Sequence, residues 1–259
     1  MINIAVVGAN GKMGKETVKM VLNNPDFKLT SAVDKFKTED KIGNVPINDN
    51  IDSLLNSNID VVVDFTNPAS IYENAKFYME NKIKAVIGTT GLSKEQVEEI
   101  ESISNKNKTG CIIAPNFSLG AILMMKFASF ASKYFSNAEI IEYHHNQKHD
   151  APSGTAIKTA QLMIENNDNF KLGNCQEKET LTGSRGGNYQ ENNKGNIQIH
   201  SVRMPGFVAS QEVIFGSSGQ TLKIHHDTIN RECYMSGVAL AINHVFENNK
   251  FIYGLEKIL

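Results

Sequence analysis

The chain has 259 residues, of which 41% are hydrophobic and 21% are charged, and its formal net charge is −2. This length is typical of about two domains, and the composition excludes a disordered or fibrous protein. Nucleic-acid binding is not expected, because the chain has no excess of positive charge to neutralise a phosphate backbone.

The first half of the chain alternates short β-branched runs with helical patterns, which is typical of βαβ units and a parallel sheet. Pro68 would lie in the first turn of one helix, where its missing N–H costs nothing. Ser93 and Gln96 have the spacing of a capping box at the start of another helix. The predicted strands are residues 2–7, 27–33, 61–63, 85–87 and 111–114, and the predicted helices are residues 11–22, 68–80 and 93–104.

The pattern changes in the second half of the chain. Residues 166–195 are rich in glycine and asparagine and lack any period, so we predict a surface loop there. Three strand-like runs then follow at a spacing that favours an antiparallel sheet. A last helix, over residues 233–246, could pack back on the first domain. The other predicted elements are helices over residues 119–134 and 155–164 and strands over residues 138–143, 197–203, 211–215 and 221–225.

The cysteines and the apolar stretches indicate the compartment. The three cysteines are Cys111, Cys175 and Cys233. They form no CxxC pair, which favours free thiols in a reducing compartment. The longest apolar stretch, residues 121–135, is interrupted by lysines and is too short to span a bilayer. Since residues 2–7 already read as a buried strand, we expect no leader peptide and predict a cytoplasmic protein without membrane contact.

Glycines gather in the loop between the first predicted strand and the first predicted helix. Residues without Cβ allow both a tight turn and the approach of a pyrophosphate to the amides of a helix N-terminus. The spacing is GxxGxxG rather than GxGxxG, so a glycine-rich turn without a ligand is the alternative. The loop residues expected to contact a dinucleotide are Gly8, Ala9, Asn10, Gly11, Lys12 and Met13.

Asp34 ends the second predicted strand, 20 residues beyond Gly14. An acidic residue at this place is expected to bind the hydroxyls of the adenosine ribose. Lys35 and Lys37 could instead attract a 2′-phosphate, so the pocket is predicted to accept NADH, NADPH or both. The alternative is that these lysines only solvate a loop.

Two further turns follow strands of the same alternating region. In an open α/β sheet the ligand lies beyond the carboxyl ends of the strands, where both turns must be. Their small residues would let backbone approach the two sides of a nicotinamide ring, although each alone is an ordinary turn. The residues concerned are Gly88, Thr89 and Thr90 in the first turn and Ala114, Pro115, Asn116 and Phe117 in the second.

Residues 142–156, here called the histidine segment, contain three of the seven histidines. A histidine such as His144 suits a group that supplies a proton while a hydride arrives from a cofactor. Lys148 adds positive charge for a substrate carboxylate, and residues 152–155 open a helix whose free N–H groups form an anion site.

This segment has three alternative interpretations. Adjacent histidines on a strand point to opposite faces, so one of them could be structural. Histidine clusters sometimes bind zinc, but the segment is not HExxH and no cysteine pair is near, so we predict no metal. A solvated loop without function is the third alternative.

The histidine segment resembles the signature ExHHxxKxDxPSGTA of dihydrodipicolinate reductases, with every specified position present. The resemblance spans nearly the whole chain. It includes the glycine-rich opening, Asp64-Phe65-Thr66, the turn at Gly88, Asn116-Phe117-Ser118, Ser201-Val202-Arg203, residues 212–216 and His226-Asp227 with Arg231.

This resemblance implies NAD(P)H-dependent reduction of 4-hydroxy-tetrahydrodipicolinate, in its dehydrated form, to tetrahydrodipicolinate in lysine and diaminopimelate biosynthesis. His144 would be the proton donor and acceptor, and Lys148 the second acid. The dicarboxylate substrate would be held by His145, Ser153, Gly154 and Thr155. The coenzyme would be bound by the loop and turn residues named above, by Asp34 and Lys35, and by Arg231.

The resemblance also implies an α/β fold of two domains in a homotetramer. A Rossmann-like domain with a parallel sheet would comprise residues 1–117 and 231–259. A mixed α/β domain with a largely antiparallel open sheet, residues 118–230, would bind substrate and form the oligomer. Closure between the two domains is expected to exclude water during hydride transfer.

Two alternative functions would also use a nicotinamide coenzyme. An amino-acid or imine dehydrogenase acting on aspartate-like acids would share the fold and would reduce oxaloacetate with ammonia. A regulator that senses NAD(H) without turnover would leave the histidine segment idle, and the density of acid groups there argues against it.

Overall fold

The computed structural model describes residues 1–36, 40–170, 180–192 and 194–259. The chain divides into two compact units: unit 1 comprises Met1–Ser118 with Arg231–Leu259, and unit 2 comprises Leu119–Asn230. Lys37 and Cys175, for which the sequence predicted a phosphate contact and a free thiol, lie outside the described residues.

Unit 1 is built on an eight-stranded sheet with the order β13-β7-β6-β5-β1-β2-β4-β3. Neighbouring strands are parallel except for β3 and β4. Strand β1 lies between β2 and β5, so the following strands are added to the sheet on both sides of β1. Nucleotides bind at such a switch point. The strands are β1 (Ile2–Val7), β2 (Phe27–Val33), β3 (Lys41–Ile42), β4 (Val45–Asn48), β5 (Val61–Asp64), β6 (Lys84–Ile87), β7 (Cys111–Ile113) and β13 (Phe251–Tyr253).

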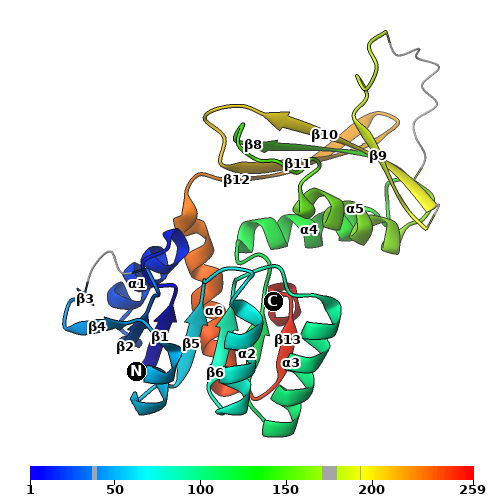
Figure 1. Ribbon diagram of the computed structural model, residues 1–259. Coiled ribbons are helices and arrows are strands. Elements are labelled where there is room, and N and C mark those ends of the chain that lie inside the picture. Colours follow the sequence, from blue (N-terminus) through cyan, green and yellow to red (C-terminus); the bar gives the residue numbers. More distant parts are fainter. Residues whose placement is uncertain (37–39, 171–179, 193) are drawn as a thin grey trace. The chain divides into compact units, whose positions relative to one another are not determined.

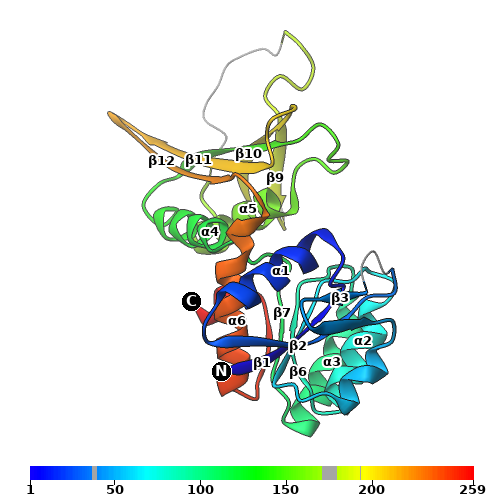
Figure 2. The same cartoon turned by 90° about the vertical axis from the view of Figure 1, so that its left-hand side faces the viewer.

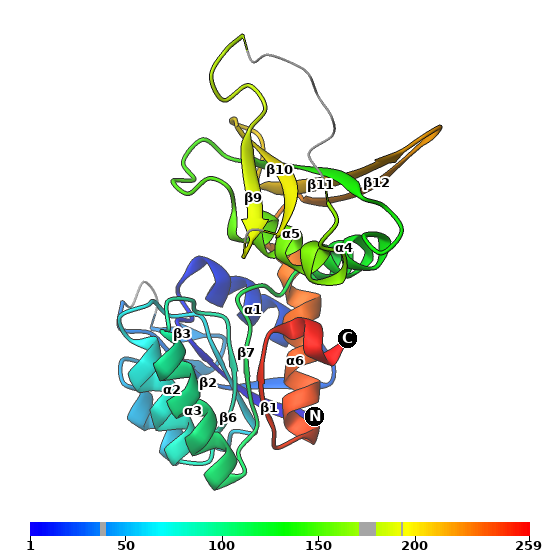
Figure 3. The same cartoon turned by 90° about the vertical axis from the view of Figure 1, so that its right-hand side faces the viewer.

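Helices cover both faces of this sheet. Helices α2 (Ile71–Glu80) and α3 (Lys94–Asn107) lie on one face, and α1 (Lys12–Asn23) and α6 (Met235–Glu247) lie on the other (Figure 3). Helices α1 and α6 pack side by side there (Figure 2). Burial on both faces explains the three consecutive valines of β5, residues 61–63.

The capping box predicted at the start of α3 is confirmed. The Ser93 hydroxyl accepts from the Gln96 N–H at 3.3 Å, and the Gln96 side chain accepts from the Ser93 N–H at 2.9 Å. The helix predicted from residue 68 begins only at Ile71, because the Asn67 side chain accepts from the Ala69 N–H at 3.0 Å and holds a turn before it.

Several short elements of unit 1 were not predicted from the sequence. Strands β3 and β4 and the short helix η1 (Ile51–Asn56) occupy the stretch between β2 and β5. Strand β13 adds to the edge of the sheet beside β7, with Phe251 opposite Cys111. These elements are two to six residues long, too short for a hydrophobic period to reveal them.

Unit 2 contains a five-stranded sheet with the order β12-β11-β8-β10-β9. Its strands are β8 (Asn137–His144), β9 (Gly187–Glu191), β10 (Lys194–Arg203), β11 (Ala209–Ser217) and β12 (Gln220–Thr228). Three of the four pairings are antiparallel, which confirms the largely antiparallel sheet, but β10 runs parallel to β8. A helix in the connection from β8 lets β10 return in the same direction.

The surface loop predicted over residues 166–195 is wrong in its last part, which contains β9 and the start of β10. Strand β9 has the sequence GNYQE and lies at the sheet edge, with only Tyr189 packed against the core. Such a polar strand is indistinguishable from a loop by composition. Its hydrogen bonds to β10 define it instead.

Helices α4 (Leu119–Ala131) and α5 (Gly154–Asn166) cover one face of the unit 2 sheet (Figure 1). The core between them includes Ile140, Ala160, Ile199 and Val213. In the described part of the chain, no helix is long and apolar enough to cross a membrane. Cys111 is buried and is a free thiol.

Candidate active site

The glycine-rich loop joins β1 to α1 in unit 1 with almost no space for side chains. Gly8 has a φ of +80°, and a Cβ there would lie 2.5 Å from the carbonyl oxygen of Phe65. A Cβ on Gly14 would lie 2.0 Å from the carbonyl oxygen of Gly8. The loop and the first turn of α1 therefore approach each other as closely as glycine allows.

The N-terminus of α1 is open for an anion. Its cap residue, Gly11, supplies no side-chain acceptor, and the first turn carries no acidic residue. The first hydrogen bond of the helix runs from the Lys15 N–H to the Gly11 carbonyl at 2.9 Å. The N–H groups of the first turn, which includes Lys12 and Met13, thus have no acceptor within the helix and lie at its positive end. This is the arrangement that binds a pyrophosphate.

Asp34 is fixed beside this loop. Its two carboxylate oxygens accept from the Asn10 N–H at 2.8 Å and the Phe36 N–H at 2.9 Å. The Asn10 side chain also donates to the Phe36 carbonyl at 3.1 Å. Each oxygen of Asp34 keeps a further lone pair, so the carboxylate is held in one orientation and can still accept from a ligand hydroxyl.

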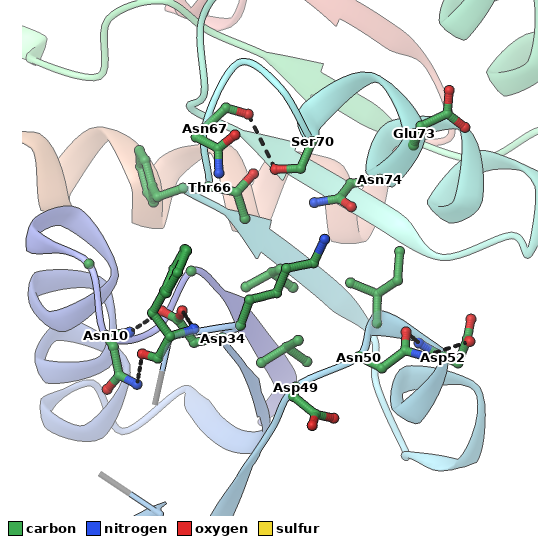
Figure 4. A pocket seen from close by; sticks show the side chains of 18 residues that line it. Asn10, Asp34, Asp49, Asn50, Asp52, Thr66, Asn67, Ser70, Glu73 and Asn74 are labelled. Atoms are coloured by element: carbon green, nitrogen blue, oxygen red, sulfur yellow. Dashed lines mark hydrogen bonds between the residues drawn. The ribbon is translucent and has the colours of Figure 1, made fainter. Parts of the chain in front are cut away.

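A pocket of about 960 Å³ lies at this edge of the sheet, beyond the carboxyl ends of β1, β2 and β5 (Figure 4). Five residues predicted to bind the coenzyme line it: Gly8, Asn10, Gly11, Asp34 and Lys35. Polar residues that the sequence reasoning missed complete the wall: Asp49, Asn50, Asp52, Thr66, Asn67, Ser70, Glu73 and Asn74. Their place after strands β4 and β5 was the only signal in the sequence.

The predicted turns after β6 and β7 do not line this pocket. They lie further along the same edge, where the ring of Phe65 meets that of Phe117 at 5.8 Å between centroids. A Cβ on Gly88 would lie 2.0 Å from the Phe65 ring. The other predicted coenzyme residues outside the pocket are Ala9, Lys12, Met13, Thr89, Thr90, Ala114, Pro115, Asn116, Phe117 and Arg231, of which Arg231 is exposed at the start of η2 (Arg231–Tyr234).

Asp64, at the end of β5, contacts the turn after β6 and has no exposed surface. It accepts hydrogen bonds from the side chains of Asn74 at 3.0 Å, Tyr78 at 2.8 Å and Thr89 at 3.3 Å. It also accepts from the backbone and hydroxyl of Thr66. Burial, together with the charge of Asp64, raises the pKa of Tyr78. Thr89, predicted to contact the coenzyme, is buried and donates to Asp64 instead.

In unit 2, strand β8 ends at His144, and the buried carboxylate of Glu142 lies two residues before it on the same face. Glu142 accepts from His144 Nδ1 and from both terminal nitrogens of Arg203, at 2.8 and 2.6 Å. Burial favours the neutral acid, but hydrogen bonds from His144, Arg203 and Ser201 outweigh it and lower the pKa of Glu142 to about 2. Glu142 is therefore ionised at neutral pH.

The histidine segment continues into α5. The Ser153 hydroxyl caps the helix by accepting from the Ala156 N–H at 3.2 Å, so this buried side chain is occupied within the protein. Gly154 is exposed, and a Cβ on it would meet none of the described residues within 4 Å. The first N–H groups of α5, at Gly154 and Thr155, therefore open toward free space at the positive end of the helix.

Lys148 and His145 lie in the turn between β8 and α5. The Lys148 ammonium donates to both carboxylate oxygens of Asp150, at 2.8 and 2.9 Å. This bond lowers the pKa of Asp150. His145 is exposed just beyond the strand. Unit 2 thus brings together an imidazole, an ammonium and an open helix end, a combination that can hold carboxylates and move a proton.

Models of a known family match nearly the whole chain. The model described as dihydrodipicolinate reductase, N-terminus, matches residues 2–117, and that of the C-terminus matches residues 120–259. The chain belongs to the dihydrodipicolinate reductase family. This membership makes it an NAD(P)H-dependent oxidoreductase and confirms the Rossmann-type character of unit 1.

The sequences of curated relatives align with this chain over nearly their full length. The 4-hydroxy-tetrahydrodipicolinate reductase of Carboxydothermus hydrogenoformans is 46% identical, and the alignment covers 100% of both chains. That of Streptococcus pneumoniae is 45% identical over 100% of this chain and 99% of its own. The solved structure of a dipicolinate-bound dihydrodipicolinate reductase from Paenisporosarcina sp. TG-14 is 45% identical, covers 100% of both chains and has a TM-score of 0.91.

Substitution Gly14→Ala tests the close contact between the glycine-rich loop and α1. The added methyl must displace the Gly8 carbonyl, so we expect a loss of about 1–3 kcal/mol in the free energy of unfolding. NADH affinity, measured by fluorescence titration, should fall about 10-fold or more. Gly216→Ala is the control, because a Cβ there would contact no atom within 4 Å in the part of the chain that the structure describes. Equal NADH affinity in the Gly14→Ala variant and the wild type would contradict the account of this loop.

Proposed function

We propose that the chain reduces the dehydrated form of 4-hydroxy-tetrahydrodipicolinate to tetrahydrodipicolinate, a step of lysine and diaminopimelate biosynthesis, with His144 as the proton donor. The observation that carries this assignment is the grouping of His144, Lys148 and the open end of α5 in one segment of unit 2. The dipicolinate held by the solved relative is a dicarboxylate of the same kind as the substrate.

The substrate would be held by its carboxylates. The N–H groups of Gly154 and Thr155 would bind one substrate carboxylate at the positive end of α5. The Lys148 ammonium and His145 would bind a negatively charged group of the same substrate molecule. Ser153 would contribute by capping the helix rather than by direct contact, since its hydroxyl accepts from the Ala156 N–H. Gly154 suits this role because it leaves space above the helix end.

The proton would come from the Nε2 side of His144. An ionised carboxylate only accepts hydrogen bonds, so the contact with Glu142 requires the proton of the neutral imidazole on Nδ1. Nε2 is then the nitrogen that takes a proton from solvent and passes it on. The coenzyme supplies the hydride. Together the hydride and the proton saturate one double bond of the substrate ring.

The pocket of unit 1 would hold the adenosine half of the coenzyme. Asp34 would accept from the ribose hydroxyls, Gly8 to Met13 would surround the pyrophosphate, and Lys35 would lie near a 2′-phosphate where one is present. The turns containing Gly88 and Phe117 would contact the nicotinamide half, and Arg231 would also bind the coenzyme. We propose that both NADH and NADPH are accepted.

Lys35→Gln tests the phosphate contact. A lysine paired with a phosphate makes a charge-assisted bond, so we expect kcat/KM for NADPH to fall about 10-fold while the value for NADH stays within about twofold. Steady-state kinetics with both coenzymes check this. Lys28→Gln, which changes an exposed lysine of β2 outside the pocket, is the matched control. An equal loss with both coenzymes would remove the proposed role of Lys35.

We also propose that the protein is a cytoplasmic homotetramer assembled through unit 2. The support is that α4 and α5 cover one face of the five-stranded sheet and leave the other without a covering helix in the described residues (Figure 1). Sedimentation of the purified protein measures its mass, and a monomer at micromolar concentration would contradict the assembly.

The activity is tested by coenzyme oxidation. NADH or NADPH is supplied together with a synthase that condenses pyruvate and aspartate semialdehyde, and absorbance reports turnover. Turnover that depends on the synthase supports the assignment. Turnover with oxaloacetate and ammonia in its place would indicate an amino-acid dehydrogenase. Coenzyme binding without turnover on either substrate would indicate a nucleotide-sensing regulator.

A further inference from the structure

We infer that Glu142 is a positioning residue that fixes the tautomer of His144 and ties this imidazole to the anion-binding end of α5. The inference rests on the proposed function, in which His144 donates the proton. Neither the substrate nor the coenzyme needs to touch Glu142 for this role.

Every hydrogen-bonding direction of Glu142 is used within unit 2. Its Oε2 atom contacts His144 Nδ1 and accepts from Arg203 Nη1 at 2.8 Å. Its Oε1 atom accepts from Arg203 Nη2 at 2.6 Å and from the Ser153 N–H at 3.2 Å. The side chain of Glu142 is 0% exposed, whereas the imidazole of His144 is 15% exposed. The carboxylate therefore cannot reach a ligand, but the histidine that it holds can.

The charge of Glu142 is balanced where it lies. Two hydrogen bonds from Arg203 neutralise the carboxylate, and the same contact raises the pKa of Arg203. Replacing a buried ion pair by apolar side chains is often neutral or stabilising, so stability alone is a weak reason for this pair. A function that needs a permanently ionised acceptor at Nδ1 explains it better, because such an acceptor excludes the opposite tautomer.

Glu142 and Arg203 also fix three points of the histidine segment relative to one another. Glu142 contacts His144 at the end of β8 and the Ser153 N–H at the start of α5. Arg203 donates to the Asp150 carbonyl at 2.8 Å in the turn between them, and Asp150 holds Lys148. The proton donor, the ammonium and the helix end are thus anchored to one ion pair, which sets the spacing between the groups that would hold and protonate the substrate.

The same strand carries a second glutamate cluster that serves as a control. Glu139 contacts Arg185, and it contacts His200 Nε2 at 2.8 Å. Its side chain is 37% exposed, and its place three residues before Glu142 on β8 puts it on the opposite face of the sheet. This cluster has the same three residue types but includes no residue of the histidine segment.

The test substitutes each glutamate by glutamine, which keeps the size and removes the charge. In Glu142→Gln the amide can donate to Nδ1, so the neutral His144 should shift from the Nδ1–H toward the Nε2–H tautomer in ¹⁵N NMR spectra, with its signal assigned by its loss in His144→Gln. We expect kcat to fall roughly 10- to 100-fold and KM for NADH to stay within about twofold. Glu139→Gln should change neither the tautomer nor kcat.

The outcomes separate this inference from the proposed function. Wild-type kcat and tautomer in a folded Glu142→Gln variant overturn the inference, whereas wild-type kcat in His144→Gln overturns the proposed function instead. If Glu142→Gln does not fold, Glu142→Asp keeps the charge and shortens the side chain. It should retain the Nδ1–H tautomer with a lowered kcat, and wild-type kcat in that variant overturns the inference as well.

Discussion

Replacing His144 with glutamine is expected to lower kcat by roughly 100-fold or more, because a general acid contributes at least this factor. Glutamine keeps a hydrogen-bonding group near Glu142 but cannot carry a proton to the substrate. KM for NADH should change little, since the coenzyme pocket is formed by residues of unit 1. Steady-state kinetics in the synthase-coupled assay measure both quantities.

His149→Gln is the matched control for this experiment. His149 is exposed, belongs to the same segment and is assigned no role in the reaction. Its substitution should leave kcat within about twofold of the wild type. A loss at His149 as large as that at His144 would show that any change in this segment disturbs catalysis, and the assignment of the proton donor would not stand.

Replacing Lys148 with glutamine should lower kcat/KM for the dicarboxylate by roughly 100-fold or more, because a charge-assisted hydrogen bond to a carboxylate is lost. The loss of Asp150 as a partner costs little in stability, since the Asp150 side chain is 63% exposed and such pairs contribute little. The thermal midpoint should therefore stay close to that of the wild type. Kinetics at varied substrate and fixed NADH give the result.

The control for Lys148→Gln is Lys158→Gln on α5. Lys158 is exposed and lies just beyond the histidine segment in the sequence. Its side chain donates to Gln161 at 3.2 Å. Unchanged kinetics are expected for this variant. An unchanged kcat/KM in Lys148→Gln itself would contradict the proposed binding of the substrate carboxylate by Lys148.

Local chemistry made much of unit 1 predictable. The strand, glycine-rich loop and helix from Ile2 to Asn23 follow one another in the sequence, and the turn residues required there leave few alternatives. The capping box at Ser93 is local in the same way. The residues of the histidine segment are contiguous, so its acid and anion-binding groups could be predicted from the sequence alone.

Contacts between distant residues were not predictable. Arg203 lies 61 residues beyond Glu142, and only the parallel pairing of β10 with β8 brings them together. Asp64 accepts hydrogen bonds from side chains of α2 and of the turn after β6. No periodic pattern in the sequence predicts these contacts. A signal for Glu142 did exist, because its two-residue spacing from His144 on a strand puts both side chains on one face.

The most direct test of the account is a crystal structure of the protein with coenzyme and dipicolinate. We predict a dipicolinate carboxylate within hydrogen-bond distance of the Gly154 or Thr155 N–H and of the Lys148 ammonium, with His144 Nε2 facing the ring. Dipicolinate bound away from residues 142–156, with the His144 imidazole turned into bulk solvent, would contradict it.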